Sequence, residues 1–475
     1  MPDPREIRRL LEGELGPGAV VAEAPGLESY ARDETPGLSV PPDLAVLPRS
    51  AAEVAAVLRL ATAHGFPVIP RGAGTGVVAG ALAVGGGVVL SLERLNRILE
   101  IDADNMMAVV EPAVVTGQLQ REAAARGLFY PPDPQSVDSC SIGGNVATGA
   151  GGPRAVKYGV TRDYVTGCEL ALPTGEVLTL GGKIVKYATG YHLLDLVIGS
   201  EGTLGVVTQV TLRLLPLPGH RASLLVPFAT LEEAAAAVAE IVRRRLQPAA
   251  LEFMDAGAID ASRRFLEREL PFPDAGAHLI VEVDGHTAEA VGAAYEAIGE
   301  LCLARGAADV LVADGRAEQE TLWKGRRVVG EAVRSQNRDV AKQDVVVPRM
   351  AIPELVAGLR EIGARAGAPV ICFGHAGDGN VHVNILGGDL DEESWRRAKA
   401  EVFPALIREV YRLGGVLSGE HGIGWLKKGE LASVLPPRHL ELMRGIKRVF
   451  DPAGILNPGK VFDSLSPGSE VSLSR

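Results

Sequence analysis

The sequence is poor in aromatic residues, which make up 4% of its 475 positions. Proteins that bind single-stranded nucleic acid stack bases on aromatic side chains, so this composition argues against that function. The charge argues against it as well, because 59 Asp and Glu against 48 Lys and Arg give a net charge of -11, which repels phosphate backbones. We therefore expect no nucleic-acid partner, and an anionic small substrate would need locally placed cations.

Cysteine is scarce and scattered. Cys140, Cys168, Cys302 and Cys372 show no CxxC spacing, which excludes a Cys-only zinc or iron–sulfur site and is typical of a reducing cytoplasm. No stretch approaches the roughly 20 apolar residues that cross a bilayer. The first residues, Met1–Glu6, lack the apolar core of a signal peptide. We expect a cytoplasmic protein without a transmembrane segment, and peripheral association with the inner face of the membrane stays open.

The chain is rich in hydrophobic residues, which make up 47% of its 475 positions. A chain of this length and composition can form more than one hydrophobic core. Strand and helix patterns alternate, and the character changes around Pro216–Gly219. The sequence predicts an α+β protein in three parts, namely a domain over 1–217, an α+β domain over 218–425 and a C-terminal helical segment over 426–475.

Capping boxes predict where two of the helices begin. Ser50 with Glu53 and Thr230 with Glu233 have the spacing at which the two side chains bond each other's backbone N–H groups. Further helices are expected from Thr116, over Ala288–Arg305 and from Arg438. Strands are expected over Asp43–Leu47, Pro67–Ile69, Gly87–Leu92, Met107–Val110, Cys168–Leu180 (as a hairpin), Leu204–Leu214, Leu279–Val283, Val310–Val312 and Val345–Val347.

The most informative motif is the glycine-rich run Pro70–Gly80, which follows a short strand. Consecutive glycines expose backbone N–H groups and tolerate positive φ, the chemistry of a pyrophosphate cradle. Gly74–Ala79 also matches the GxGxxA fingerprint of NAD-binding folds, and Glu93 lies near the expected distance downstream. That fingerprint needs a following helix, whereas Gly85–Gly87 would end one after a few residues. An NAD site and a turn that binds nothing are therefore the weaker interpretations.

Two further segments carry dense motifs, Tyr130–Gly159 and Gly199–Val207. Together with the glycine loop, and in this order, they resemble the FAD-binding domain of the vanillyl-alcohol-oxidase superfamily, in its D-lactate dehydrogenase/glycolate oxidase branch. The resemblance covers nearly the whole chain. It implies a two-subdomain FAD-binding (PCMH-type) domain, an α+β, ferredoxin-like substrate (cap) domain, and a C-terminal segment that returns to complete the FAD site.

The resemblance also implies which residues hold FAD. Relatives that tether the flavin covalently carry a histidine near the centre of the loop, where this chain has Thr75, so it implies non-covalent FAD. The implied cofactor-binding residues are Pro70, Arg71, Gly72, Ala73, Gly74, Thr75, Gly76, Gly80, Pro132, Asp133, Ser136, Gly143, Gly144, Asn145, Thr148, Gly202, Gly205, Val207, Asn457 and Lys460.

A second constellation lies some three hundred residues later. His375 and His382 flank a glycine turn, and Glu420 and His421 lie in a further glycine-rich segment. Two imidazoles and a carboxylate suit a divalent metal such as Zn²⁺ or Mn²⁺, although a histidine near glycines is commonly a hydrogen-bonded turn residue. A metal-dependent hydrolase would use the same cluster and stays an alternative.

By the resemblance, His375, His382 and Glu420 bind the metal, His421 is the general base and Asn384 contacts substrate. Arg326 and Lys342 match substrate-binding residues of relatives, and arginine offers a two-pronged contact to a carboxylate. Where the D-2-hydroxyglutarate branch has a hydroxyl residue, this chain has Gly330, which favours a smaller hydroxy acid.

The sequence thus predicts an FAD-dependent enzyme that oxidises a D-2-hydroxy acid. D-2-hydroxyglutarate dehydrogenase and a non-catalytic flavin subunit of a multi-subunit glycolate oxidase stay alternatives. The electron acceptor is left open between a quinone, a cytochrome and an iron–sulfur partner subunit. Whether the chain forms a homodimer is also left open.

Overall fold

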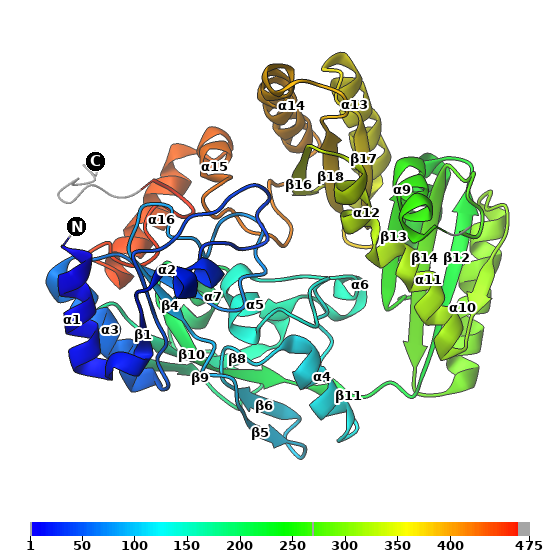
Figure 1. The fold of residues 1–475 in the computed structure, drawn as a ribbon. Coiled ribbons are helices and arrows are strands. Elements are labelled where there is room, and N and C mark those ends of the chain that lie inside the picture. Colours follow the sequence, from blue (N-terminus) through cyan, green and yellow to red (C-terminus); the bar gives the residue numbers. More distant parts are fainter. Residues whose placement is uncertain (1, 268–269, 464–475) are drawn as a thin grey trace. The chain divides into compact units, whose positions relative to one another are not determined.

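The computed structural model describes residues 2–267 and 270–463 (Figure 1). Its contacts divide the chain into two compact units. Unit 1 comprises Met1–Ala150, Val160–Leu217 and Glu420–Arg475, and unit 2 comprises Gly151–Gly159 and Pro218–Gly419. Both units mix helices and sheets, which confirms the predicted α+β class.

Unit 1 combines small sheets with helices from both ends of the chain. Its elements are α1 (Pro4–Leu15), η1 (Pro17–Ala19), β1 (Val20–Val21), α2 (Ala24–Leu27), η2 (Glu28–Tyr30), β2 (Leu44–Val46), α3 (Ala51–His64), β3 (Val68–Arg71), β4 (Val88–Ser91), β5 (Ile98–Asp102), β6 (Met107–Val110), α4 (Thr116–Ala124), β7 (Leu128–Phe129), α5 (Ile142–Thr148), η3 (Thr161–Asp163), β8 (Val165–Ala171), β9 (Val177–Gly181), α7 (Leu193–Val197), β10 (Val206–Arg213), β11 (Leu215–Pro216), α15 (Lys428–Val434) and α16 (Pro437–Phe450).

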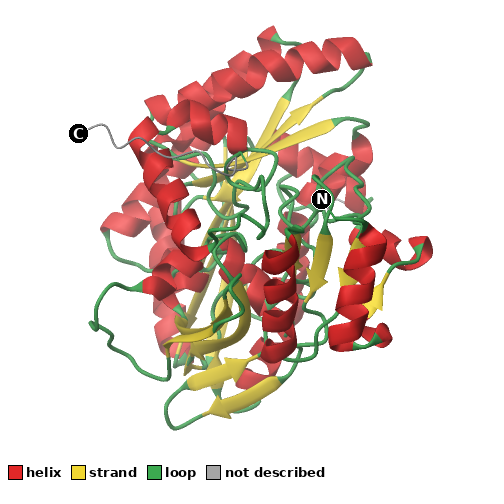
Figure 2. Ribbon diagram, turned by 90° about the vertical axis from the view of Figure 1, so that its left-hand side faces the viewer, coloured by secondary structure: helices red, strands yellow, loops and turns green. Residues whose placement is uncertain are grey.

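Two sheets of unit 1 share α3 as a common core element. One has the order β1-β2-β4-β3, with β2, β4 and β3 parallel, and the other has the antiparallel order β5-β6-β10-β8-β9. The β5 and β6 strands form the hairpin at the bottom of Figures 1 and 2. Helix α3 begins as predicted, because Ser50 accepts the Glu53 N–H, and its apolar side chains pack with those of both sheets.

The glycine loop follows β3 and leads directly into β4. Residues 72–87, all of which are described, contain no helix. Because β3 and β4 are neighbouring parallel strands, the chain crosses between them by turns alone, in contrast to the helical crossover of an NAD-binding unit. The sequence-based objection to an NAD site is therefore confirmed at this loop.

The C-terminal part of the chain returns to this sheet, as predicted. After α16, Val68 N donates to Ile455 O at 2.8 Å and Asn457 N donates to Val68 O at 2.8 Å. Leu456 consequently pairs with Val68 in parallel orientation at the edge of β3. The segment around Asn457 is thereby fixed beside the strand that leads into the glycine loop.

Unit 2 is organised around one antiparallel sheet with the order β15-β12-β14-β13-β17-β18-β16. Its elements are α6 (Ala155–Tyr158), β12 (His220–Phe228), α8 (Leu231–Arg243), β13 (Ala250–Asp255), α9 (Ala256–Leu266), β14 (Ala277–Gly285), α10 (Ala288–Ala304), β15 (Leu311–Ala313), α11 (Arg316–Arg327), α12 (Val329–Gln336), β16 (Val340–Val346), η4 (Arg349–Ala351), α13 (Ile352–Arg365), β17 (Val370–His375), β18 (Asn380–Leu386) and α14 (Glu392–Arg412).

Helices cover the apolar parts of this sheet. α9, α11 and α12 pack on one face, in a core that includes Leu225, Met254 and Ile280. α8 and α10 contact β12 and β14, and Gly299 of α10 lies against Leu224, whose side chain points to the opposite face. The strand face under α9, α11 and α12 continues into the polar side chains described below.

One local prediction in this unit was wrong. Lys342 was expected before a strand, but it lies within β16, because pairing with β18 extends the strand back to Val340. Arg326 lies in the last turn of α11, directly ahead of α12, and buried Trp323 anchors α11 by donating to Ser223 Oγ at 3.0 Å. Among the described residues, no helix combines the length and apolar character needed to span a bilayer.

Candidate functional site

One face of the unit 2 sheet gathers most of the predicted catalytic and metal-binding side chains. On β18, His382 and Asn384 alternate with apolar residues and therefore share a face. His382 lies directly opposite Asp344 of β16, and Asn384 lies opposite Lys342. Since directly paired residues project to the same side, strand register alone brings these four side chains together.

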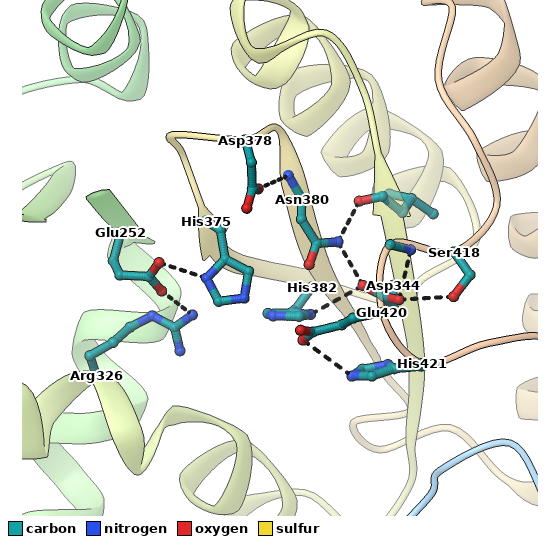
Figure 3. Close-up of polar contacts among 12 residues, drawn as sticks. Glu252, Arg326, Asp344, His375, Asp378, Asn380, His382, Ser418, Glu420 and His421 are labelled. Atoms are coloured by element: carbon teal, nitrogen blue, oxygen red, sulfur yellow. Dashed lines mark hydrogen bonds and ion pairs between the residues drawn. The ribbon is translucent and has the colours of Figure 1, made fainter. Parts of the chain in front are cut away.

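Glu252 links two of the predicted residues. His375 lies opposite it on the neighbouring strand, and His375 Nδ1 is 2.6 Å from Glu252 Oε1. The other carboxylate oxygen, Oε2, is 2.7 Å from a terminal nitrogen of Arg326 (Figure 3). Burial alone would raise the pKa of Glu252, but its interactions with His375 and Arg326 hold that pKa below its usual value.

Asp344 organises the opposite end of the same face. Its Oδ1 accepts from Asn380 Nδ2 at 2.6 Å and lies 3.6 Å from His382 Nδ1. Its Oδ2 accepts from Ser418 Oγ at 3.0 Å and from Gly419 N at 2.9 Å (Figure 3). These bonds hold the start of the predicted glycine-rich segment at β16, one residue before Glu420.

The donor groups suit a divalent metal. Within unit 2, Asp344 Oδ1 lies 3.6 Å from His382 Nδ1, and within unit 1, Glu420 Oε1 lies 3.7 Å from His421 Nε2. Imidazole nitrogens with carboxylate oxygens are the usual donors for Zn²⁺ and Mn²⁺. The predicted ligand His375 also lies in unit 2, and its ring centroid is 5.1 Å from that of His382.

Arg326 sits between the polar face and a cavity. Its guanidinium lies 4.7 Å from the ring centroid of Phe373, which in turn is opposite His382 in the sheet. Arg326 also lines a cavity of about 410 Å³ within unit 2, together with His278, Glu318 and Thr321. The remaining lining residues are apolar except for glycine, namely Leu225, Met254, Leu270, Pro271, Ile280, Leu311, Val312, Ala313, Ala317, Leu322 and Gly325.

In unit 1, the three glycine-rich segments meet. A Cβ placed on Gly72 would lie 2.5 Å from Ser141 Oγ and 3.6 Å from Gly144 N, so the first loop passes closely over the start of α5. In the same way, a Cβ placed on Gly202 would lie 3.3 Å from Pro70 Cγ. The structure thereby brings together segments that are about 70 and 130 positions apart in the sequence.

The first loop leaves room along part of its length. A Cβ on Gly76 would meet no atom within 4 Å, and one on Gly80 would meet only the Glu201 carboxylate at 3.9 Å. Gly74 is different, because its φ is +73° and a Cβ there would collide with the Arg71 guanidinium, so both its backbone and its surroundings require glycine. Gly76 and Gly80 therefore border open space.

Several predicted cofactor residues are engaged in holding these loops. Arg71 donates to Arg32 O at 2.7 Å, Asn145 Nδ2 to Thr116 Oγ1 at 2.8 Å, and Thr148 Oγ1 to Gly144 O at 3.1 Å. Gly143, Gly144, Asn145 and Thr148 all lie in α5. Gly143 packs against Pro112, and Gly205 against Leu170 just before Val207 in β10.

Other predicted residues lie on neighbouring segments. Pro132 O accepts from Gln120 Nε2 of α4 at 2.9 Å, which ties the stretch containing Asp133 and Ser136 to that helix. Ala73 and Thr75 lie within the glycine loop between the residues described above.

The returning C-terminal segment closes the loop end. Asn457 Nδ2 donates to Gly80 O at 3.1 Å and to Glu201 O at 2.8 Å. Lys460 Nζ donates to Leu82 O at 2.7 Å, and burial lowers the pKa of Lys460 to about 8. Asn457 thus joins the end of the Pro70–Gly80 loop to the Gly199–Val207 segment, and Lys460 bonds the chain two residues beyond that loop.

Sequence reasoning missed Glu252, Asp344 and Glu201, whose contacts hold residues or backbone of the predicted site. Glu252 stands within the buried apolar strand Ala250–Asp255, and a carboxylate in that setting is itself a signal of a special role. Asp344 lies two positions after Lys342, and it is fully buried. Glu201 belongs to the Gly199–Val207 motif, but its hydrogen bonds to Ile423 N and Gly424 N are long-range and leave no local pattern.

Comparison with known proteins agrees with this architecture. Residues 42–181 match the family model described as an FAD binding domain, and residues 217–461 match that of FAD linked oxidases, C-terminal domain. A D-lactate dehydrogenase of Anaerostipes hadrus is 41% identical over 88% of this chain and 89% of its own length. Glycolate oxidase subunit GlcD of Bacillus subtilis is 37% identical over 91% and 92%, respectively.

A solved structure shows the same fold. p-Cresol methylhydroxylase with substrate bound superposes with a TM-score of 0.81 over 97% of each chain, at 18% identity. Since the FAD-binding model spans the loop Pro70–Gly80, the dinucleotide that this domain binds is FAD.

Proposed function

The chain belongs to the FAD-linked oxidases, and on that premise we propose that it oxidises a D-2-hydroxy acid of the D-lactate or glycolate type to the 2-oxo acid. The observation that carries the proposal is the row of Lys342, Asn384, His382 and His375 on one face of the unit 2 sheet, with Arg326 beside it. This row combines cations for a carboxylate with donors for a metal. The names of the two relatives support the substrate class.

The residues present fit the cofactors. Open space beside Gly76 and Gly80 suits the phosphates of FAD, and the His375 and His382 imidazoles with the Asp344 carboxylate, all in unit 2, suit a divalent metal. Bound FAD would supply the hydride acceptor, and a divalent metal would lower the pKa of the substrate hydroxyl. We assign the metal to His375, His382 and Glu420, and Asp344 is a further donor to be tested.

The chain's own residues then have distinct tasks. Arg326 and Lys342 bind the substrate carboxylate, and Asn384 Nδ2, which has no hydrogen-bond partner among the described residues, is available to substrate. His421 removes the hydroxyl proton, because a neutral imidazole nitrogen can accept a proton from a bound hydroxyl. Electrons then pass to an acceptor outside the chain, and the name of the GlcD relative, a glycolate oxidase subunit, supports an assembly with further subunits.

The cavity favours a small or apolar substrate side chain. Its wall is largely apolar around Arg326, and Gly330 replaces the hydroxyl residue of the hydroxyglutarate branch. D-2-hydroxyglutarate is accordingly the second candidate substrate.

The decisive experiment follows the flavin spectrum of the purified protein under anaerobic conditions. Addition of D-lactate or glycolate should bleach the visible flavin absorbance within one turnover. Protein that is colourless and does not take up added FAD, or flavin that stays oxidised with every D-2-hydroxy acid tested, would overturn the proposal. D-2-Hydroxyglutarate, tested in parallel, should bleach the flavin more slowly.

A further inference from the structure

Glu252 is a carboxylate in a place that packing alone does not explain. It lies in the middle of β13, between Leu251 and Phe253, and all three residues are buried, with Glu252 0% exposed. Taking an ionised carboxylate out of water costs several kcal/mol unless partners compensate. An apolar residue would fill this position at no such cost.

The two oxygens of Glu252 go to two different residues of the proposed site. Oε1 is 2.6 Å from His375 Nδ1, across a directly opposed strand pair. Oε2 is 2.7 Å from Arg326, which reaches it from α11 while its guanidinium stacks on Phe373. One carboxylate therefore holds a proposed metal ligand and a proposed substrate anchor at once.

We propose that Glu252 is a positioning residue that sets His375 for the metal and Arg326 for the substrate carboxylate. This inference rests on the proposed function. Because Nδ1–H of His375 donates to Oε1, the ring is fixed in the tautomer whose Nε2 carries the lone pair that a metal needs. Oε2 and the Phe373 ring together leave Arg326 few alternative rotamers, so its guanidinium is oriented before substrate arrives.

The test compares Glu252→Gln with a matched control, Glu282→Gln. Glu282 lies on the adjacent strand β14, and its side chain points to the same face, since Ile280 is opposite Glu252. It is similarly buried and similarly paired with an arginine, Arg154 at 3.2 Å, but it contacts neither His375 nor Arg326 within the described structure. A general loss of stability should change metal affinity and KM in both variants, whereas a loss of positioning should change them in Glu252→Gln alone.

Two measurements are made on FAD-loaded protein. Zn²⁺ and Mn²⁺ affinities are measured by competition with a chromogenic chelator, and kcat and KM are measured for D-lactate with and without excess metal. For Glu252→Gln we expect metal binding to weaken about 10- to 100-fold, as for other residues that orient a metal ligand. Excess metal should restore kcat, while KM should stay about tenfold higher because Arg326 is no longer held.

The outcomes separate the inference from its premise. Wild-type protein that binds neither metal would refute the proposed metal site, whereas equal metal affinity of wild type and Glu252→Gln would refute the role of Glu252. Equal losses in Glu282→Gln would show a merely structural effect and would also refute it. If Glu252→Gln does not fold, Glu252→Asp keeps the charge and withdraws it by one methylene; unchanged metal affinity and KM in that variant would count against positioning.

Discussion

Gly424 N donates a 2.7 Å hydrogen bond to Glu201 Oε2, although 223 positions separate the two residues. Ile423 N donates to the other oxygen, Oε1, at 2.8 Å. Glu201 thus fixes the backbone that directly follows Glu420 and His421, and its own carbonyl accepts from Asn457. Burial raises the pKa of this carboxyl, while the two N–H donors act in the opposite direction.

Replacing Glu201 with Gln should therefore weaken unit 1. An amide offers one oxygen in place of two, so one of the two N–H groups faces an NH₂ group and loses its acceptor. We expect a loss of about 1–3 kcal/mol in the free energy of unfolding, measured by urea denaturation. Glu100→Gln, at an exposed position, is the control and should change stability by less than about 0.5 kcal/mol; equal stabilities of the two variants would contradict the anchoring role.

Gly76 allows a test of the FAD loop that separates cofactor binding from folding. Its Cβ would meet nothing within 4 Å, and its φ does not lie in the left-handed region. Gly76→Ala should consequently leave the stability of the FAD-free protein unchanged and weaken FAD binding about tenfold or more, because the methyl group enters the space proposed for the phosphates. Gly85→Ala is the matched control, since Gly85 is equally open and lies at the far end of the same loop.

Isothermal titration with FAD measures both variants. Wild-type affinity in Gly76→Ala would place the cofactor away from this loop. A parallel loss in Gly85→Ala would show that the loop as a whole, and not its contact with FAD, had been disturbed.

FAD should leave the protein on denaturation. The loop centre is Gly74-Thr75-Gly76, and residues 70–80 contain no histidine, cysteine or tyrosine to attach the flavin. Acid precipitation should leave the yellow flavin in the supernatant. Flavin that stays with the precipitated chain would show a covalent bond formed elsewhere.

Local sequence signals determined much of the fold. The Ser50–Glu53 and Thr230–Glu233 pairs placed the starts of α3 and α8 correctly, because capping depends on residues only three apart. The β18 strand that carries His382 and Asn384 shows a similarly local alternation of polar and apolar residues. The start of β16 was missed because pairing with β18, and not the composition of residues 340–344, makes that stretch a strand.

The functional face was predicted in part for the same reason. Residues in recognisable motifs, such as His375 and His382, were found, whereas their partners were not. Glu252 becomes the neighbour of His375 through strand pairing across 123 positions, and no sequence period reports such a contact. Asp344 likewise acquires its role from Ser418 and Gly419, which reach it from the end of unit 2.

His421→Ala should separate cofactor binding from chemistry. If His421 is the base, the variant should bind FAD normally and reduce it with D-lactate about 10²- to 10⁴-fold more slowly, the usual contribution of a general base. Stopped-flow measurement of flavin bleaching checks this. His439→Ala, at an exposed position in α16, is the control, and unchanged single-turnover reduction in His421→Ala would refute the assignment.

Lys460 should make FAD binding depend on pH. Burial lowers the pKa of its ammonium from 10.5 to about 8, against the opposing charges of Asp33 and Glu201. In the cofactor-free protein the folded state therefore binds fewer protons than the unfolded chain between about pH 8 and 10, and the free energy of unfolding should rise with pH across that window. Negatively charged FAD favours the protonated lysine, so FAD affinity should fall by up to about tenfold for each pH unit above 8.

Fluorescence titrations at about pH 7 and 9, on either side of that pKa, measure this change in FAD affinity. The affinity should fall in the wild type and in the control Lys186→Met, since Lys186 is exposed. In Lys460→Met the affinity should be weaker and independent of pH. Equal pH dependence in wild type and Lys460→Met would assign the titration to another group and remove Lys460 from the FAD site.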